Sequence, residues 1–397
     1  MSANLQIDWL KDDAARALLA EDFADFVPTD GEATVFNTPE WLLPVTHHLL
    51  GARQLLILRA RLDGKLIALV PLTWGTERMA GIPVRTLRYL GYPLSDRISI
   101  LLSACSAASA AALVNGLLTC PEPWDLIAFD ELLRPDVERL MALVAAHPRK
   151  IKTRVRHCAR SPRLNVHQLE SDHLNQQYSR SLRTRLSRAR KKQAVGRVDI
   201  QRISGAVDAC DSHLHAIAEI ERVSWKGDQG VGIFAPGRSF DFFSSVSREL
   251  LAKDRLDIWE MRFNDRLIAY RWQPRFGRAV LDYNFAHLPE YDGLSPGRVL
   301  LDEIVQAAAK DGTLDWVDAS RGSISKPHLL RDWTSDYIDH FALWLVNTTA
   351  RGALVHLLAT QVNPWVKRTR TYWSTRTSAK AAPKTLDGSG DSGADLR

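Results

Sequence analysis

The chain has 397 residues, of which 45% are hydrophobic and 25% charged, and its formal net charge is +6. These values are ordinary for globular proteins and exclude wholesale disorder; no apolar run reaches the roughly 18 residues of a membrane-spanning helix. The N-terminus has no basic region leading into an apolar run, so we expect no secretory signal and a cytoplasmic location. The four cysteines form no CxxC pair, which argues against disulfides and structural zinc.

A repeat organises the chain, because residues 41–68 align without a gap with residues 242–269 at a constant offset of 201. Each copy reads as helix, strand, tight turn and strand, and the turns contain Asp63-Gly64 and Asn264-Asp265. Identical partners occur at Val45, Leu49, Leu50, Leu55, Ile57, Arg61, Leu66, Ile67 and Ala68. The pattern predicts a tandem duplication of a mixed α/β unit.

The repeat also predicts the domain organisation. We expect an N-terminal domain over residues 1–160 and a C-terminal domain over residues 161–346. A helix and a basic-aromatic segment follow over residues 347–376. Residues 377–397 are small and polar without periodicity, which predicts a disordered tail.

The next predicted element is a basic helix over residues 180–192. Leu182, Leu186 and Ala189 fall at i, i+4 and i+7, so one stripe is apolar and arginines occupy the remaining surface. Such a run is either a solvated face or a clamp for the phosphates of a cofactor, a nucleic acid or an anionic glycan, since arginine pairs with them bidentately.

No metal site or common nucleophile motif is expected. Asp211, His213, His215 and Glu219 lie on a predicted helix, where positions 211, 213 and 215 do not share a face. The chain also lacks a GxSxG elbow, a Walker loop with lysine and a separate dinucleotide fingerprint.

The second repeat carries the sharper signal. A predicted strand over residues 278–287 leads through a loop to Ser295-Pro296-Gly297-Arg298, a helix follows, and residues 313–319 alternate as another strand. Ser295 suits the N-cap and Pro296 the first helical position. A glycine at 297 would let a ligand approach the free N–H groups, so this helix end is a candidate pyrophosphate cradle; the alternative is an ordinary capped helix.

This order of elements resembles the GNAT acyltransferase superfamily. More narrowly, the chain resembles the tandem-GNAT, CelD-like acetyltransferases associated with cellulose and exopolysaccharide biosynthesis, and more distantly the Fem peptidyltransferases, which take aminoacyl groups from tRNA. The segments that carry the resemblance lie between residue 36 and about residue 345: FNTPEWL at 36–42, LDGKLIALVPL at 62–72, LRYLGYPLSD at 87–96, the arginine-rich helix, FNDRLIAYRW at 263–272, YDGLSPGRVLL at 291–301, and Asp318 with Gly322 and Lys326. The resemblance implies two tandem GNAT-like domains, each a mixed, mostly antiparallel sheet flanked by helices.

The resemblance also implies an activity, transfer of an acyl group from acetyl-CoA or another acyl-CoA to an amine or a sugar-linked acceptor, tied to polysaccharide or cell-envelope synthesis. The second repeat would bind the donor, and the first, which lacks an equivalent Ser-Pro-Gly loop, would shape the acceptor cleft. The residues implied as donor-binding are Ser295, Gly297, Arg298, Arg183 and Arg190. Asp282 and Asp318 are candidates for the base or for orienting the acceptor, and Lys326 for a carboxylate or phosphate contact.

Two alternatives stay open. One is a Fem-like transferase that takes its acyl group from aminoacyl-tRNA. The other is a non-catalytic protein on a GNAT scaffold that binds nucleic acid or a membrane surface through the basic helix and the basic-aromatic segment. We expect no specific nucleic-acid partner, and we keep peripheral membrane contact as an option.

Overall fold

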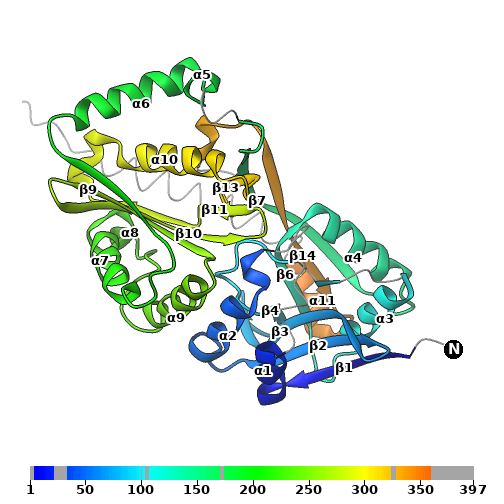
Figure 1. Ribbon diagram of the computed structural model, residues 1–397. Helices are drawn as coiled ribbons and strands as arrows, with labels where there is room; N and C mark the ends of the chain where they lie inside the picture. The colour runs from blue at the N-terminus through cyan, green and yellow to red at the C-terminus, as the bar shows by residue number, and fades with distance from the viewer. Residues whose placement is uncertain are drawn as a thin grey trace, which may run out of the picture.

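The computed structural model describes residues 4–21, 34–99, 101–102, 107–169, 174–322 and 328–358, which form two lobes (Figure 1). The predicted tail over 377–397 and most of the segment 347–376 lie outside these ranges, as does Lys326. The N-terminal lobe contains β1 (Leu5–Lys11), α1 (Asp12–Glu21), η1 (Val35–Asn37), α2 (Pro39–His48), β2 (Gln54–Leu62), β3 (Lys65–Met79), β4 (Ile82–Tyr89), β5 (Leu101–Leu102), α3 (Ala107–Leu118), β6 (Leu126–Leu133) and α4 (Arg134–Ala146).

The strand β7 (Lys152–Asn165) then leads into the C-terminal lobe. Its elements are α5 (Leu174–Gln177), α6 (Arg180–Gln193), β8 (Val198–Ile203), α7 (Cys210–Val223), α8 (Trp225–Gln229), α9 (Arg238–Ala252), β9 (Leu256–Phe263), β10 (Arg266–Phe276), β11 (Ala279–Leu281), β12 (Asn284–His287), η3 (Pro289–Leu294), α10 (Pro296–Lys310), β13 (Trp316–Asp318) and η4 (Leu329–Asp332). The last elements are β14 (Tyr337–Val346) and α11 (Ala350–Leu357). In this lobe α6 and α10 lie on one side of the sheet and α7, α8 and α9 on the other (Figure 1).

The strands of both lobes form one mixed sheet, in the order β1-β2-β3-β4-β6-β14-β7-β13-β11-β10-β9-β8. The late strand β14 lies between β6 and β7, so the end of the chain completes the sheet of the N-terminal lobe. In turn β7 pairs with β14 over most of its length and with β13 at its last three residues. The boundary predicted between residues 160 and 161 falls inside β7 and remains a prediction, whereas the predicted α/β class with a mixed sheet flanked by helices is confirmed.

The predicted repeat is confirmed element by element, with α2, β2 and β3 matching α9, β9 and β10. The two equivalent helices also pack on each other near the middle of the molecule (Figure 1). Trp41 and Phe242 occupy equivalent positions, and their ring centroids lie 5.3 Å apart, edge to face. Both rings are completely buried, so the aromatic contact between the copies forms part of a core shared by the two lobes.

Buried polar contacts join the lobes beside this core. The guanidinium of Arg97, from the loop after β4, donates to both carboxylate oxygens of Asp318 at 3.0 Å. Both side chains are at most 6% exposed. Nearby, the hydroxyl of Tyr283 donates to the carbonyl of Leu94 at 2.9 Å. The loop between β4 and β5 is therefore fixed against the C-terminal lobe.

Gly297 sets how closely α10 approaches β12. A Cβ atom at this position would lie 2.5 Å from Cζ of Phe285 and 3.3 Å from a methyl carbon of Leu329. Distances this short force neighbouring groups to move, so close packing is by itself a sufficient reason for a glycine at this position. Within the described ranges, no helix combines the length and apolar character needed to cross a membrane.

The Arg97–Asp318 pair predicts a large stability effect. Arg97→Met should lower the free energy of unfolding by about 3 to 5 kcal/mol, because Asp318 would remain buried with only Arg163 at 3.6 Å to balance its charge. Arg59→Met is the matched control, since it breaks the more exposed pair with Asp8 and should cost less than about 1 kcal/mol. Urea unfolding monitored by circular dichroism measures both, and equal losses would contradict the assignment.

Gly297 gives a second prediction about packing. Gly297→Ala should destabilise the fold by about 1 to 3 kcal/mol through overpacking, and adding Phe285→Ala should recover part of that loss. Gly293→Ala, where an added Cβ has no atom within 4 Å, should stay within about 0.5 kcal/mol of wild type. Thermal unfolding of wild type, Gly297→Ala, Phe285→Ala, the double variant and the control Gly293→Ala decides; no coupling between positions 285 and 297 would count against the packing role.

Candidate active site at the junction of the lobes

A break in a strand opens the candidate site. The strand predicted over residues 278–287 is interrupted at Asp282 and Tyr283, which separates β11 from β12. β11 runs parallel to β13, and the amide of Asp282 still donates to the carbonyl of Asp318 at 2.7 Å. Beyond this point β12 pairs with β10, and its other edge has no strand partner among the described residues. Backbone polar groups on that edge therefore face the space between β12 and β13.

The start of α10 lies next to this break. Ser295 occupies the predicted N-cap position and Pro296 the first helical position, but the backbone of Ser295 is left-handed (φ 52°) and its side chain accepts no capping hydrogen bond. Arg271, on the strand β10, donates a hydrogen bond to the carbonyl of Gly297 at 2.8 Å. Since Phe285 and Leu329 enclose Gly297, the described side chains shield this part of the predicted pyrophosphate cradle.

Asp282 is held by a buried polar network. Its carboxylate accepts hydrogen bonds from Arg271 and from the amide nitrogen of Gln273 at 3.2 Å, and Nε2 of His328 lies 3.3 Å away. Burial alone would raise the pKa of Asp282, but Arg271 and His328 outweigh it and hold the pKa well below its usual range. A carboxylate this acidic is a weak proton acceptor near neutral pH, and its contacts suit it to orient the start of α10.

Asp318 is completely buried and bound from several sides. Besides Arg97, its carboxylate accepts from the backbone amide of Ser320 at 2.8 Å, and Arg163 lies 3.6 Å away. The other predicted carboxylate therefore joins the lobes and fixes the turn after β13.

The predicted donor-binding arginines lie in three settings. Arg298, in the first turn of α10, donates to Asp332 of η4 at 3.0 Å. Arg190 is engaged with the buried Asp302 at 2.6 Å, whereas Arg183 is exposed on α6. The predicted helix of residues 180–192 is confirmed, with Leu182, Leu186 and Ala189 as its buried face.

Asp96 is a residue that the sequence interpretation missed. It lies in the loop that carries Arg97 and accepts a hydrogen bond from the Ser320 hydroxyl at 2.8 Å. Burial raises the pKa of Asp96 to about 7, although Ser320 and Arg321 act in the opposite direction. The segment LRYLGYPLSD at 87–96 ends on this residue, but nothing in its local pattern indicates that a second lobe surrounds the carboxylate.

A second set of linked polar side chains lies next to the backbone of Asp96. Nε2 of His340 lies 3.0 Å from the Ser161 hydroxyl, and its Nδ1 lies 3.2 Å from both a carboxylate oxygen of Glu131 and the carbonyl of Asp96. Arg321 pairs with Glu131 at 2.8 Å. His340 and Ser161 are fully buried, so this chain positions the junction and does not itself meet a substrate.

The junction thus combines a strand edge that no other described strand covers, a helix N-terminus and a half-buried carboxyl whose pKa burial raises to about 7. Such a set can take a proton from an attacking nucleophile and stabilise an oxyanion. Across the part of the chain that the structure describes, no group of three His, Cys, Asp or Glu side chains is placed to hold a metal ion.

Comparisons with known proteins agree with this geometry. Residues 180–328 match the family model described as "Acetyltransferase (GNAT) domain". No curated protein matches the chain. Three solved structures share its fold: FemX (TM-score 0.57, 10% identity, covering 86% of this chain and 98% of FemX), a conserved protein of unknown function from Bacteroides thetaiotaomicron (0.56, 12%, 85% and 99%), and the C-terminal domain of a protein described as a lysylphosphatidylglycerol synthetase from Agrobacterium fabrum (0.51, 10%, 87% and 96%).

The matched segment begins at α6 and contains both sides of the strand break together with α10. Identities of 10 to 12% make the likeness to the solved structures one of fold alone. Residues 180–328 are therefore similar to GNAT acetyltransferase domains, and the chain as a whole has a mixed α/β fold similar to that of FemX.

Proposed function

We propose that the protein is an acyltransferase whose reaction centre lies at the junction of the lobes. The observation that carries this proposal is the position of Asp96 from the N-terminal lobe beside Ser320, where β12 and β13 of the GNAT domain separate. The C-terminal lobe would hold the acyl donor, with its carbonyl along the free edge of β12. The N-terminal lobe would supply the base and the acceptor surface.

In this proposal Asp96 takes a proton from the acceptor amine. The nitrogen attacks the acyl carbon, a carbon–nitrogen bond forms, and the carbon–sulfur bond to CoA breaks. Backbone N–H groups on the free edge of β12 would stabilise the oxyanion, and the departing thiolate takes up a proton. Asp282 and Asp318 would keep the two strands and α10 in register, and Lys326 stays a proposed contact to substrate phosphate or carboxylate.

An acceptor surface near Asp96 supports an amine or sugar-linked acceptor. Tyr92 is 48% exposed, and the guanidinium of Arg88 lies 4.3 Å from its ring centroid, which holds the aromatic face in place. Arg88 also pairs with Asp130 at 2.9 Å, next to Glu131 and its partner Arg321. An aromatic face beside carboxylates and guanidinium groups suits an acceptor with hydroxyls and an amine, as expected in polysaccharide or cell-envelope synthesis.

The donor is proposed to be acetyl-CoA or another acyl-CoA, because the matched family is an acetyltransferase domain. One observation favours the alternative, aminoacyl-tRNA. Gly297 is enclosed, while Arg180, Arg183, Arg188, Lys191 and Lys192 are all exposed on α6 and suit a larger polyanion.

Asp96 gives the test of the chemistry. The rate of acyl transfer by the wild-type protein should rise with pH through about 7, because the base acts in its deprotonated form and burial raises its pKa to about 7. Asp96→Asn should lower kcat/KM by about 10²- to 10⁴-fold and abolish that rise. Asp125→Asn, which removes a buried carboxylate next to the start of β6, should keep the pH dependence. A wild-type-like pH profile in Asp96→Asn would rule out the base role.

Arg183 gives the test of the donor. Isothermal titration calorimetry with acetyl-CoA should show binding that Arg183→Gln weakens about tenfold, equivalent to about 1.4 kcal/mol. Arg222→Gln, on the opposite side of the sheet and paired with Glu219, should leave the affinity unchanged. Binding of aminoacyl-tRNA together with no binding of acetyl-CoA would replace the proposed donor by the alternative.

A further inference from the structure

A buried carboxylate on α7 accepts hydrogen bonds from several elements around the strand break. Glu221 is 3% exposed. Its Oε1 accepts from Nζ of Lys226 at 2.9 Å, from the hydroxyl of Tyr270 at 2.7 Å and from the side-chain amide of Asn284 at 3.0 Å. Its Oε2 accepts from the backbone amide of Phe234 at 2.8 Å. This one carboxylate therefore joins α7 and α8 to the strands β10 and β12, on the face of the sheet opposite α10 (Figure 1).

The environment of Glu221 keeps the carboxylate ionised. Burial alone would raise the pKa of Glu221, but the charge of Lys226 and the hydrogen bonds outweigh burial and lower the pKa. The contacts also fix the direction of the Asn284 amide. Its nitrogen donates both to the carboxylate and, at 3.1 Å, to the hydroxyl of Tyr270, and a carboxylate can only accept.

Asn284 lies directly before the part of β12 whose edge is free. The amide of Leu288 donates to the carbonyl of Ile268 on β10 at 2.9 Å. Because amides alternate in direction along an antiparallel strand, the amide of Asn284 also faces β10, whereas those of Phe285 and His287 face the free edge. Phe285 is thus the first residue of β12 whose amide is directed toward the space between β12 and β13, and the residue before it is bound to the buried carboxylate.

The free edge of β12 is held in place from both faces of the sheet. On the α10 face, the guanidinium of Arg271 lies 4.4 Å from the ring centroid of Phe285, and the ring packs against Gly297. On the opposite face, the side chain of Asn284 is bound by Glu221. Among the described residues β12 has β10 as its one strand partner, so these two anchors determine where its free edge lies.

We infer that Glu221 is a positioning residue for acyl transfer, which fixes β12 through the side chain of Asn284 so that the Phe285 amide is directed at the acyl oxygen. Glu221 itself touches neither substrate. An amide that stabilises an oxyanion is effective when it is already in place before the charge develops, and a buried hydrogen-bonded carboxylate provides that rigidity. This inference rests on the proposed function, because it assigns a role in that reaction.

Asn284→Leu tests the link most directly, since leucine has a similar size and Glu221 keeps its three other donors. The variant should lower kcat about 10²-fold, as loss of an oxyanion donor does, and leave the KM for acyl-CoA unchanged. The rise of the rate through about pH 7 should persist, because Asp96 is untouched. Glu221→Gln should give the same pattern, and the double variant should lose no more than the weaker single variant. Losses that add would contradict a shared pathway.

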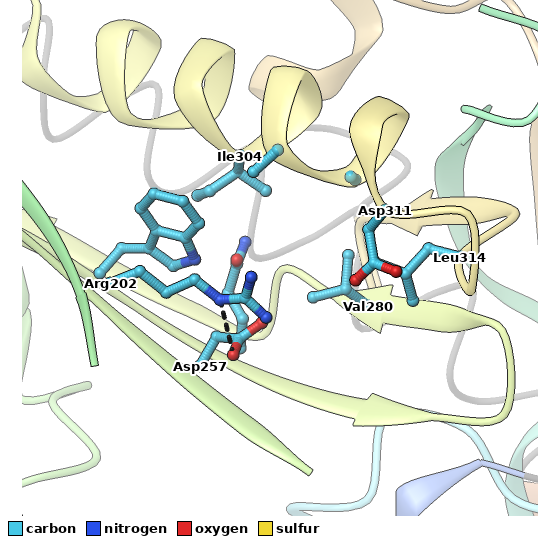
Figure 2. A pocket seen from close by; sticks show the side chains of 10 residues that line it. Arg202, Asp257, Val280, Ile304, Asp311 and Leu314 are labelled. Carbon is cyan, nitrogen blue, oxygen red and sulfur yellow. Dashed lines mark ion pairs between the residues drawn. The ribbon is translucent and has the colours of Figure 1, made fainter. Parts of the chain in front are cut away.

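Two control variants separate positioning from stability. Asp257, a buried carboxylate of β9, pairs with Arg202 at 3.0 Å, and Figure 2 shows the pair beneath Ile304 on the α10 face of the sheet. Asp257→Asn should lower Tm without lowering kcat. Glu219→Gln, at an exposed position on α7, should change neither. If Asp257→Asn lowered kcat as much as Asn284→Leu does, the loss would be one of stability and the inference would be refuted.

Amide hydrogen exchange measures the position of β12 without the reaction. By the alternation along the strand, the amide of Ala286 faces β10. It should exchange faster in Asn284→Leu and in Glu221→Gln than in wild type, while the amides of β9 keep their rates. Unchanged exchange in β12 would overturn the positioning role whatever the activity. A wild-type protein that transfers no acyl group would reject the proposed function itself, and the exchange rates do not depend on that result.

Discussion

The buried ion pair between Arg97 and Asp318 is the interaction on which the arrangement of the two lobes depends. Taking both charges out of water is costly, and the attraction compensates only because the pair is bidentate, Asp318 also accepts a hydrogen bond from the Ser320 amide, and Arg163 adds a positive charge 3.6 Å away. The pair lies at the end of the pairing between β11 and β13, beyond which β12 and β13 separate, so the contact that joins the lobes also shapes the proposed reaction centre. Because Arg97 follows Asp96 directly, fixing one places the other beside Ser320.

The buried polar groups beneath α10 are likewise stabilised by contacts with one another. Asp257, Gln273, Asp282 and Arg271 occupy the face of the sheet that a helix ordinarily covers with apolar packing, and each carries a contact to another polar group. Such networks specify one geometry when they are satisfied and are costly when they are not.

The sequence predicts the elements of the fold better than their connections. Periodicity locates α6 within a residue, and the repeat at a constant offset predicts that α2 and α9 are equivalent. The sequence does not predict that β14 pairs with β6, because strand order depends on contacts between distant segments. For the candidate site, Asp282 and Asp318 are predicted from the strands that carry them. Asp96 could not be predicted, because burial between the lobes raises its pKa and the burial of a loop carboxylate has no local sequence pattern.

The central claim, that acyl transfer takes place where the lobes meet, is tested most directly by a crystal structure with an inert acyl-CoA analogue in which a ketone replaces the thioester. The ketone carbon should lie between β12 and β13, with its oxygen toward the free edge of β12 and Asp96 on the side from which an acceptor would approach. An analogue bound with its ketone outside this junction, for example over the N-terminal lobe away from Asp96, would contradict the claim.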